Sequence, residues 1–240
     1  MKEQGFFPTV DRYFRRKDTV MARVLQEVCP LEGPQYLESG FKRTLDTTFA
    51  VAIALESVPL LTTLALAAKV ESGGGGKAFF IHQRIGQERP LGVIKIRSMK
   101  EGSDSDAWAN QNFARIYGPE NDPRTTPLGR LIKKFDLEEL PQVWQVAFGQ
   151  LALVGIRAAA QYAIDYLKDA RPQTAGSWQD AYQKGRPGLV SLNYAMSSPR
   201  DRKDDARRYH VDMFYAKKAS LGLDLYILWR AACRFFSKFI

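Results

Sequence analysis

The chain has 240 residues, which is enough for one domain of ordinary size and an extension. Hydrophobic residues make up 45% of it, which excludes a disordered chain, and two cysteines are too few for a disulfide framework or a zinc site. The net charge of +9 indicates an anionic partner, either nucleic acid, acidic lipid or a phosphorylated substrate.

Residues 1–40 have a mixed composition. A basic and aromatic cluster at residues 12–17 is typical of a surface helix, or else of a contact with a membrane surface. The prolines and glycine of residues 29–34 predict a break in any helix there. The first residues contain no apolar run, so we expect no secretory signal peptide.

Residues 49–68 form the most apolar stretch, and its twenty residues are long enough to cross a bilayer. Glu56 would place a charge near the bilayer centre, and Pro59 removes a helical hydrogen bond. We therefore expect a helical hairpin that enters the membrane, bends near Pro59 and leaves on the same side. A buried helix of a soluble protein is the alternative. Arg43 and Lys69 flank the stretch and favour the cytoplasmic side for both ends.

Glycines at 73–76 predict a flexible linker, and no phosphate-binding loop motif surrounds them. Residues 78–81 and 91–96 read as short strands on either side of a loop. Residues 101–127 are polar and predict a loop with a short helix, and 185–188 predict a turn. Helical patterns cover residues 128–135, 139–149, 158–170, 203–216 and 221–239.

Residues 135–142 hold three carboxylates, Asp136, Glu138 and Glu139, just before Pro141. Pro141 suits the first turn of a helix, and acidic groups there face the positive end of the helix dipole. Asp136 and Glu139 also have the spacing of a capping box. The stretch is therefore interpreted either as a capped helix start or as an active-site carboxylate pair.

Several short motifs, taken together in order and spacing, decide between these interpretations. Over about residues 40–240 the chain resembles the bacterial sugar transferase family, the monotopic phosphoglycosyl transferases. The motifs that carry the resemblance lie at residues 42–46, 79–86, 95–99, 122–124, 128–130, 137–142, 153–157, 186–188, 212–215 and 223–225.

The resemblance implies a helix-rich α/β fold, a membrane-associated monotopic domain with a kinked re-entrant helical hairpin and a small sheet. We expect residues 1–40 to be an N-terminal extension, 41–70 the re-entrant membrane helix, and 71–240 the catalytic domain with an amphipathic C-terminal helix.

The resemblance also implies transfer of a phosphosugar from a nucleotide diphosphate sugar to a polyprenol phosphate. The reaction starts lipid-linked glycan or exopolysaccharide synthesis at the cytoplasmic face of the bacterial inner membrane. Membrane lipid is an expected partner and nucleic acid is not. A homodimer or a partner glycosylation protein is a further expectation.

The family's catalytic pair is an Asp followed by a Glu, in which the Asp is the nucleophile and the Glu holds Mg²⁺. By position, Glu138 is the expected nucleophile and Glu139 the magnesium ligand. Lys95, Arg157 and Asp212 occupy other active-site positions, with Asp212 in a catalytic role and the two cations on phosphate. Further expected phosphate contacts are Arg97, Arg130 and Lys133.

The chain differs from the family where the chemistry is expected. Glu138 is one methylene longer than the usual Asp, and Ala158 follows Arg157 where the family has proline. These changes support a second hypothesis, a catalytically impaired homologue that acts as a binding or scaffold subunit of a glycan-assembly complex. A nucleic-acid binder, the third hypothesis, rests on net charge and on basic-aromatic clusters.

Overall fold

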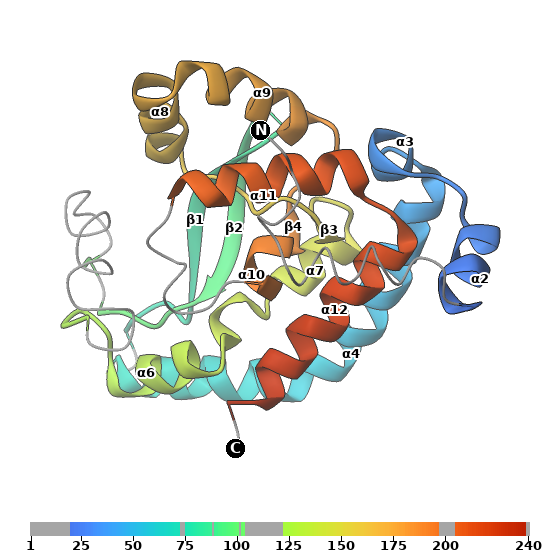
Figure 1. The fold of residues 1–240 in the computed structure, drawn as a ribbon. Coiled ribbons are helices and arrows are strands. Elements are labelled where there is room, and N and C mark those ends of the chain that lie inside the picture. The colour runs from blue at the N-terminus through green and yellow to red at the C-terminus, as the bar shows by residue number, and fades with distance from the viewer. Residues whose placement is uncertain are drawn as a thin grey trace.

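The computed structural model describes residues 20–72, 75–87, 89–100, 102–103, 122–196 and 205–238. Within them the fold is rich in helix and contains two small two-stranded sheets (Figure 1). The basic-aromatic cluster at 12–17 and most of the predicted loop at 101–127 lie outside the described residues. The helices are α2 Val20–Val28, α3 Gly33–Leu37, α4 Gly40–Glu71, α6 Pro127–Lys134, α7 Gln142–Ala147, α8 Gln161–Ala170, α9 Pro172–Gln183, α10 Leu192–Met196, α11 Asp205–Lys218 and α12 Leu221–Phe236, with the 3₁₀ turn η1 at Leu137–Glu139.

The first sheet is an antiparallel hairpin of β1, Phe79–Gly86, and β2, Arg89–Ile96. The two predicted strands are confirmed, but both extend into the predicted loop, so that only residues 87 and 88 connect them. The register sets Phe80 opposite Lys95. Since side chains alternate between the faces of a strand, this register decides which residues of β1 lie on the same face of the hairpin as Lys95.

The second sheet pairs β3, Ala152–Val154, with β4, Gly188–Val190, in parallel. The sequence patterns did not predict these three-residue strands or helix α9. Next to this sheet the backbones at Gly155 and Gly188 approach closely. A Cβ on Gly188 would lie 2.1 Å from the backbone nitrogen of Gly155. Both positions therefore require glycine.

The largest hydrophobic core lies among α3, α9, α11, α12 and β3, and includes the fully buried side chains of Tyr36, Trp178 and Tyr215. Tyr36 belongs to the predicted N-terminal extension, yet its hydroxyl donates to Asp224 Oδ2 at 3.0 Å. The backbone nitrogen of Gly33 donates to the carbonyl of Ala219 at 2.7 Å. Residues 33–37 are thus packed into the body of the domain.

Helix α4 is one continuous helix that contains Pro59, so the structure does not show the two separate arms of the predicted hairpin. A proline inside a helix removes one hydrogen bond. Nearby hydroxyls bond to backbone carbonyls of the preceding turn, with Thr63 Oγ1 2.9 Å from the carbonyl oxygen of Pro59 and Ser57 Oγ 2.8 Å from that of Ala54. The helix continues past the proline to Glu71.

One stripe of α4 is buried along its whole length, and much of the remaining surface is apolar and exposed. By length and composition the helix could cross a membrane, although only 28% of its apolar window is buried, which does not fit the alternative of a buried helix in a soluble protein. The buried positions are Lys42, Asp46, Ala50, Ala54, Ser57, Leu61, Leu64 and Ala68. The exposed ones include Phe49, Val51, Ile53, Leu55, Val58, Leu60, Leu66 and Val70.

Both ends of α4 contact the same domain. Near the N-terminal end, Lys42 Nζ lies 2.8 Å from Asp224 Oδ2 of α12. At the C-terminal end, Glu71 Oε1 accepts from the backbone nitrogen of Leu128 in α6 at 2.9 Å. Figure 1 shows α4 running from beside α3 to beside α6, along one side of the molecule.

Candidate active site

The carboxylates of residues 135–142 lie in a turn between two helices. Asp136 has a left-handed backbone conformation with φ of 55°, and its side chain makes no capping bond to η1. The predicted capping box is therefore wrong. The Asp136 carboxylate instead accepts from the hydroxyl of Tyr194 at 2.6 Å and contacts Lys238. Helix α7 begins directly after Pro141, which holds its N-cap position.

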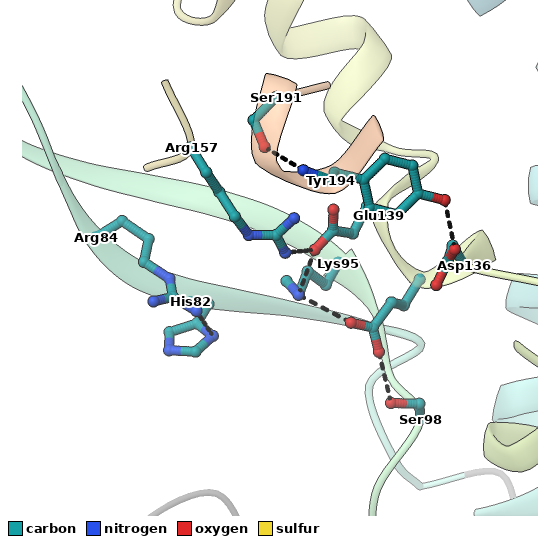
Figure 2. A network of polar contacts seen from close by, with 10 residues as sticks. His82, Arg84, Lys95, Ser98, Asp136, Glu139, Arg157, Ser191 and Tyr194 are labelled. Carbon is teal, nitrogen blue, oxygen red and sulfur yellow. Dashed lines mark hydrogen bonds and ion pairs between the residues drawn. The ribbon is translucent and has the colours of Figure 1, made fainter. Parts of the chain in front are cut away.

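Lys95 joins the two glutamates of this turn to the hairpin. Its Nζ donates to Glu138 Oε1 and to Glu139 Oε1, each at 2.9 Å (Figure 2). Arg157 Nη2 contacts the same oxygen of Glu139. The structure thus brings together four of the residues predicted from the sequence, from three separate segments of the chain.

Ser98 is an additional contact that the sequence interpretation did not single out. Its hydroxyl lies 3.3 Å from Glu138 Oε2, so both oxygens of Glu138 have a partner. The backbone of Ser98 is pressed against α6, since a Cβ on Gly129 would lie 1.9 Å from its carbonyl oxygen. The backbone nitrogen of Thr126 also donates to this oxygen, at 3.2 Å. Only its place directly after the Lys95 strand could have indicated Ser98.

Backbone hydrogen bonds hold the loop that carries Arg157, although Ala158 stands where the resemblance predicts proline. Gly155 donates to the carbonyl of Val190 at 3.0 Å, and Gly188 donates to that of Ile156 at 2.8 Å. Beyond Arg157, the carbonyl of Ala159 accepts from the backbone nitrogen of β1 residue Ile85 at 2.8 Å. The loop is thus fixed on both sides of the arginine.

The charges around Glu139 keep it ionised. Burial raises the pKa of its carboxyl, but the positive charges of Arg157 and Lys95 outweigh burial and bring the pKa to about 2. Lys133 lies nearby on α6 and donates to Thr125 Oγ1 at 2.8 Å. Burial lowers the pKa of Lys133, while the charge of Glu138 opposes that change.

Three other predicted residues make their contacts away from the cluster of Lys95, Glu138, Glu139 and Arg157. Arg97 stacks over the ring of Phe80 at 5.7 Å and donates through Nε to a backbone carbonyl. Arg130 is exposed on α6. Asp212 is buried on α11, where Oδ2 accepts from Trp178 Nε1 at 3.0 Å and burial raises its pKa to about 6. Their proposed roles stay predictions.

The carboxylates fit the requirements of a magnesium site that is completed by substrate. Magnesium in phosphoryl-transfer sites usually has one or two carboxylate ligands, with phosphate oxygens and water completing the octahedron. No cluster of three metal-binding side chains occurs among the residues that the structure describes. Within the same part of the chain, both contacts of the Glu139 carboxylate use Oε1, and the carboxylate is ionised. Glu139 can therefore offer one oxygen to a cation.

The comparisons with known proteins agree with the resemblance in the motifs. The family described as bacterial sugar transferase matches residues 37–238. An undecaprenyl-phosphate galactose phosphotransferase from Salmonella typhimurium is 33% identical over 201 residues, covering 80% of this chain and 39% of the relative. A UDP-galactose-lipid carrier transferase from Erwinia amylovora is 31% identical over 199 residues, covering 79% of this chain and again 39% of the relative.

A shorter relative matches over most of its own length. The exopolysaccharide production protein ExoY of Rhizobium meliloti is 30% identical over 201 residues, which is 79% of this chain and 82% of that protein. The chain therefore spans about two fifths of the length of the first two relatives and about four fifths of that of ExoY. A match over most of the chain, with 30% identity or more to several relatives, establishes that the chain belongs to the bacterial sugar transferase family.

Proposed function

We propose that this chain transfers a phosphosugar from a nucleotide diphosphate sugar to a polyprenol phosphate. The observation that carries the proposal is the glutamate pair held between Lys95 and Arg157. Relatives named as undecaprenyl-phosphate sugar phosphotransferases support this reaction class. A relative named as a UDP-glucose:undecaprenyl-phosphate glucose-1-phosphate transferase supports both substrates. We further propose that the product starts a lipid-linked glycan or exopolysaccharide, as the name of the ExoY relatives suggests.

In the first step a carboxylate oxygen of Glu138 attacks the phosphorus that carries the sugar. The bond from this phosphorus to the bridging oxygen breaks, and the nucleoside monophosphate leaves with the electron pair. A mixed anhydride between Glu138 and the sugar phosphate remains. Covalent catalysis of this kind divides one difficult transfer into two easier ones.

In the second step a phosphate oxygen of the polyprenol phosphate attacks the same phosphorus. The bond to Glu138 breaks, so the carboxylate is restored and a polyprenol diphosphate sugar is released. Lys95 lies 2.9 Å from the attacking carboxylate, which suits it to stabilise charge on the phosphoryl oxygens as they separate from Glu138.

Glu139 is the residue proposed to hold Mg²⁺. When bound, this ion would neutralise the charge of the diphosphate. Its low pKa keeps the carboxylate ionised throughout the physiological pH range. Arg157 and Lys95 share its Oε1, which fixes the direction in which Oε2 points.

We also propose that the protein lies on the cytoplasmic face of the bacterial inner membrane, with the exposed apolar side of α4 in the lipid. The contacts at both ends of α4 support a helix that does not cross the bilayer. A spanning helix would put its ends on opposite sides, whereas Lys42 and Glu71 both contact the one domain. An exposed apolar surface of this extent in contact with water would be unfavourable.

The reaction is tested with purified protein in detergent or nanodiscs, Mg²⁺, undecaprenyl phosphate and a panel of nucleotide sugars. We expect release of the nucleoside monophosphate from at least one sugar, and its loss in Glu138→Ala. Without acceptor, a phosphosugar bound covalently to Glu138 should be detected by mass spectrometry. Release that persists in Glu138→Ala would exclude Glu138 as the nucleophile.

The membrane association is tested by extraction of cell membranes. We expect the protein to stay in the membrane fraction at high salt and to be released by detergent. Release by high salt alone would exclude an embedded α4. The comparisons do not favour a scaffold subunit over the transferase, since relatives of this chain are named as sugar phosphotransferases.

A further inference from the structure

The face of the β1–β2 hairpin that carries Lys95 also carries further polar side chains next to the active site. Phe80, His82 and Arg84 alternate along β1 and so share a face, and Phe80 lies opposite Lys95. The neighbouring Ile81 points to the other face and is 57% exposed. Figure 2 shows His82 and Arg84 along the strand from Lys95, on the side where Arg157 approaches Glu139.

Arg84 is a half-buried guanidinium without an acidic partner among the described residues. Its Nη2 lies 3.4 Å from Nδ1 of His82. Burial lowers the pKa of His82 to about 4, with the charges of Arg84 and Lys95 contributing. The imidazole is therefore neutral at pH 7, and its Nδ1 can accept a hydrogen bond from Arg84.

The surroundings of Arg84 are positively charged. After burial, the charge of Arg157 lowers its pKa most and Arg208 of α11 lowers it further, while Tyr162 and then Glu139 oppose them. Lys95, Arg84 and Arg157 together outnumber the two glutamates of the turn. An unneutralised group of this kind favours a bound anion, and guanidinium groups suit phosphate through paired hydrogen bonds.

Backbone contacts fix the position of Arg84 relative to Arg157. The residue after Arg84, Ile85, donates to the carbonyl of Ala159 at 2.8 Å. The hydroxyl of Tyr182 accepts from the nitrogen of Ala159 at 3.1 Å and contacts the carbonyl of Ile85. The strand that carries Arg84 and the loop that carries Arg157 therefore form one rigid frame.

We propose that Arg84, oriented by His82, binds the phosphate of the nucleotide that leaves in the first step. The assignment rests on the proposed function. It is also supported by the direction of β1, which ends beside α9, where Gln87 Nε2 donates to the carbonyl of Gln183 at 3.1 Å. Gly86 pairs with Arg89 at this end, so Arg84 lies toward the end of the hairpin that is remote from α6, and α6 contacts the C-terminal end of the proposed membrane helix α4. Figure 1 shows α6 and α9 at opposite ends of the hairpin.

The test measures binding separately from turnover. The dissociation constant of uridine diphosphate is determined by calorimetry for the detergent-solubilised protein and for Arg84→Met. We expect Arg84→Met to weaken binding about tenfold to a hundredfold, the effect of losing a hydrogen bond between charged groups. Arg84→Lys should recover part of the affinity, and its melting temperature reports whether the variants are folded. Arg89→Met removes an exposed arginine from the same hairpin and should bind as the wild type does.

His82 is tested as a positioning residue. His82→Gln keeps a hydrogen-bond acceptor and should retain nucleotide affinity, whereas His82→Phe removes the acceptor and should lose part of it. If both variants bind alike, His82 does not orient Arg84.

The outcomes distinguish a nucleotide phosphate from a lipid phosphate at Arg84, and they test the binding role of Arg84 separately from the proposed transferase reaction. In steady-state assays we expect Arg84→Met to raise the KM for the nucleotide sugar and to leave the KM for undecaprenyl phosphate unchanged. A raised KM for undecaprenyl phosphate alone would assign Arg84 to the lipid phosphate and overturn the inference. Equal affinity of wild type and Arg84→Met would overturn it while leaving the transferase reaction intact. Nucleotide binding that depends on Arg84 in a protein without transferase activity would support the site and refute the proposed reaction.

Discussion

Replacing Lys95 by methionine tests whether this residue organises the site. The side chain is 14% exposed and its ammonium group bonds two carboxylates at 2.9 Å each. A hydrogen bond between charged groups contributes about 1.5–3 kcal/mol. Glu139 retains Arg157, so the main loss is the contact with Glu138 together with the repulsion between the two glutamates. We expect a destabilisation of about 3 kcal/mol, at the lower limit for breaking a buried pair.

For a chain of this length that loss lowers the melting temperature by about 6–12 °C. The measurement is thermal unfolding in detergent, followed by tryptophan fluorescence, for Lys95→Met, for Glu138→Gln and for the double variant. Since one interaction is removed in either single variant, we expect the double variant to be more stable than the sum of the two effects predicts. Lys95→Arg keeps the charge and is the matched control. A Lys95→Met protein that melts as the wild type does would refute the argument that Lys95 holds the glutamates together.

Three further predictions follow from the same geometry. Glu138→Asp withdraws the carboxylate from Lys95 and Ser98 by on the order of 1 Å, so nucleotide release in the transferase assay should fall about a hundredfold; a rate equal to or above that of wild type would contradict this. Gly188→Ala places a Cβ 2.1 Å from a backbone nitrogen, so it should destabilise the protein by about 1–3 kcal/mol and reduce activity through Arg157. The control Gly176→Ala lies inside α9 and meets no atom within 4 Å, so in the same unfolding and activity assays it should leave activity unchanged and raise stability by up to about 1 kcal/mol. Burial raises the pKa of Asp212 to about 6, above its usual value, so the folded protein loses stability as pH rises from 3.8 through 6, and Asp212→Asn should gain up to about 3 kcal/mol relative to wild type between pH 4 and pH 7.5. Melting temperatures measured across this pH range check the last prediction, and a gap that does not change with pH would contradict it.

The sequence alone determined the elements that depend on local pattern. The short strands predicted at 78–81 and 91–96 and the periodic helices on either side of the glutamates depend on local signals. The structure has all of these elements, although β1 continues to Gly86. The short strands β3 and β4 carry too few residues for a pattern, and their pairing depends on the approach of Gly155 to Gly188 from distant parts of the chain. Helix α4 was predicted as an apolar segment, but one proline did not decide whether it would break.

The motifs also identified the family and the residues of the site, but not their arrangement. Glu138 and Glu139 are adjacent in the sequence, whereas Lys95 and Arg157 are distant and reach them only because the hairpin and the loop after β3 are bonded to each other. Asp136 has the same charge as its neighbours, yet its left-handed backbone turns it toward Tyr194 and away from Lys95. Contacts of this kind depend on side chains that meet across long stretches of chain, so only the tertiary structure decided them.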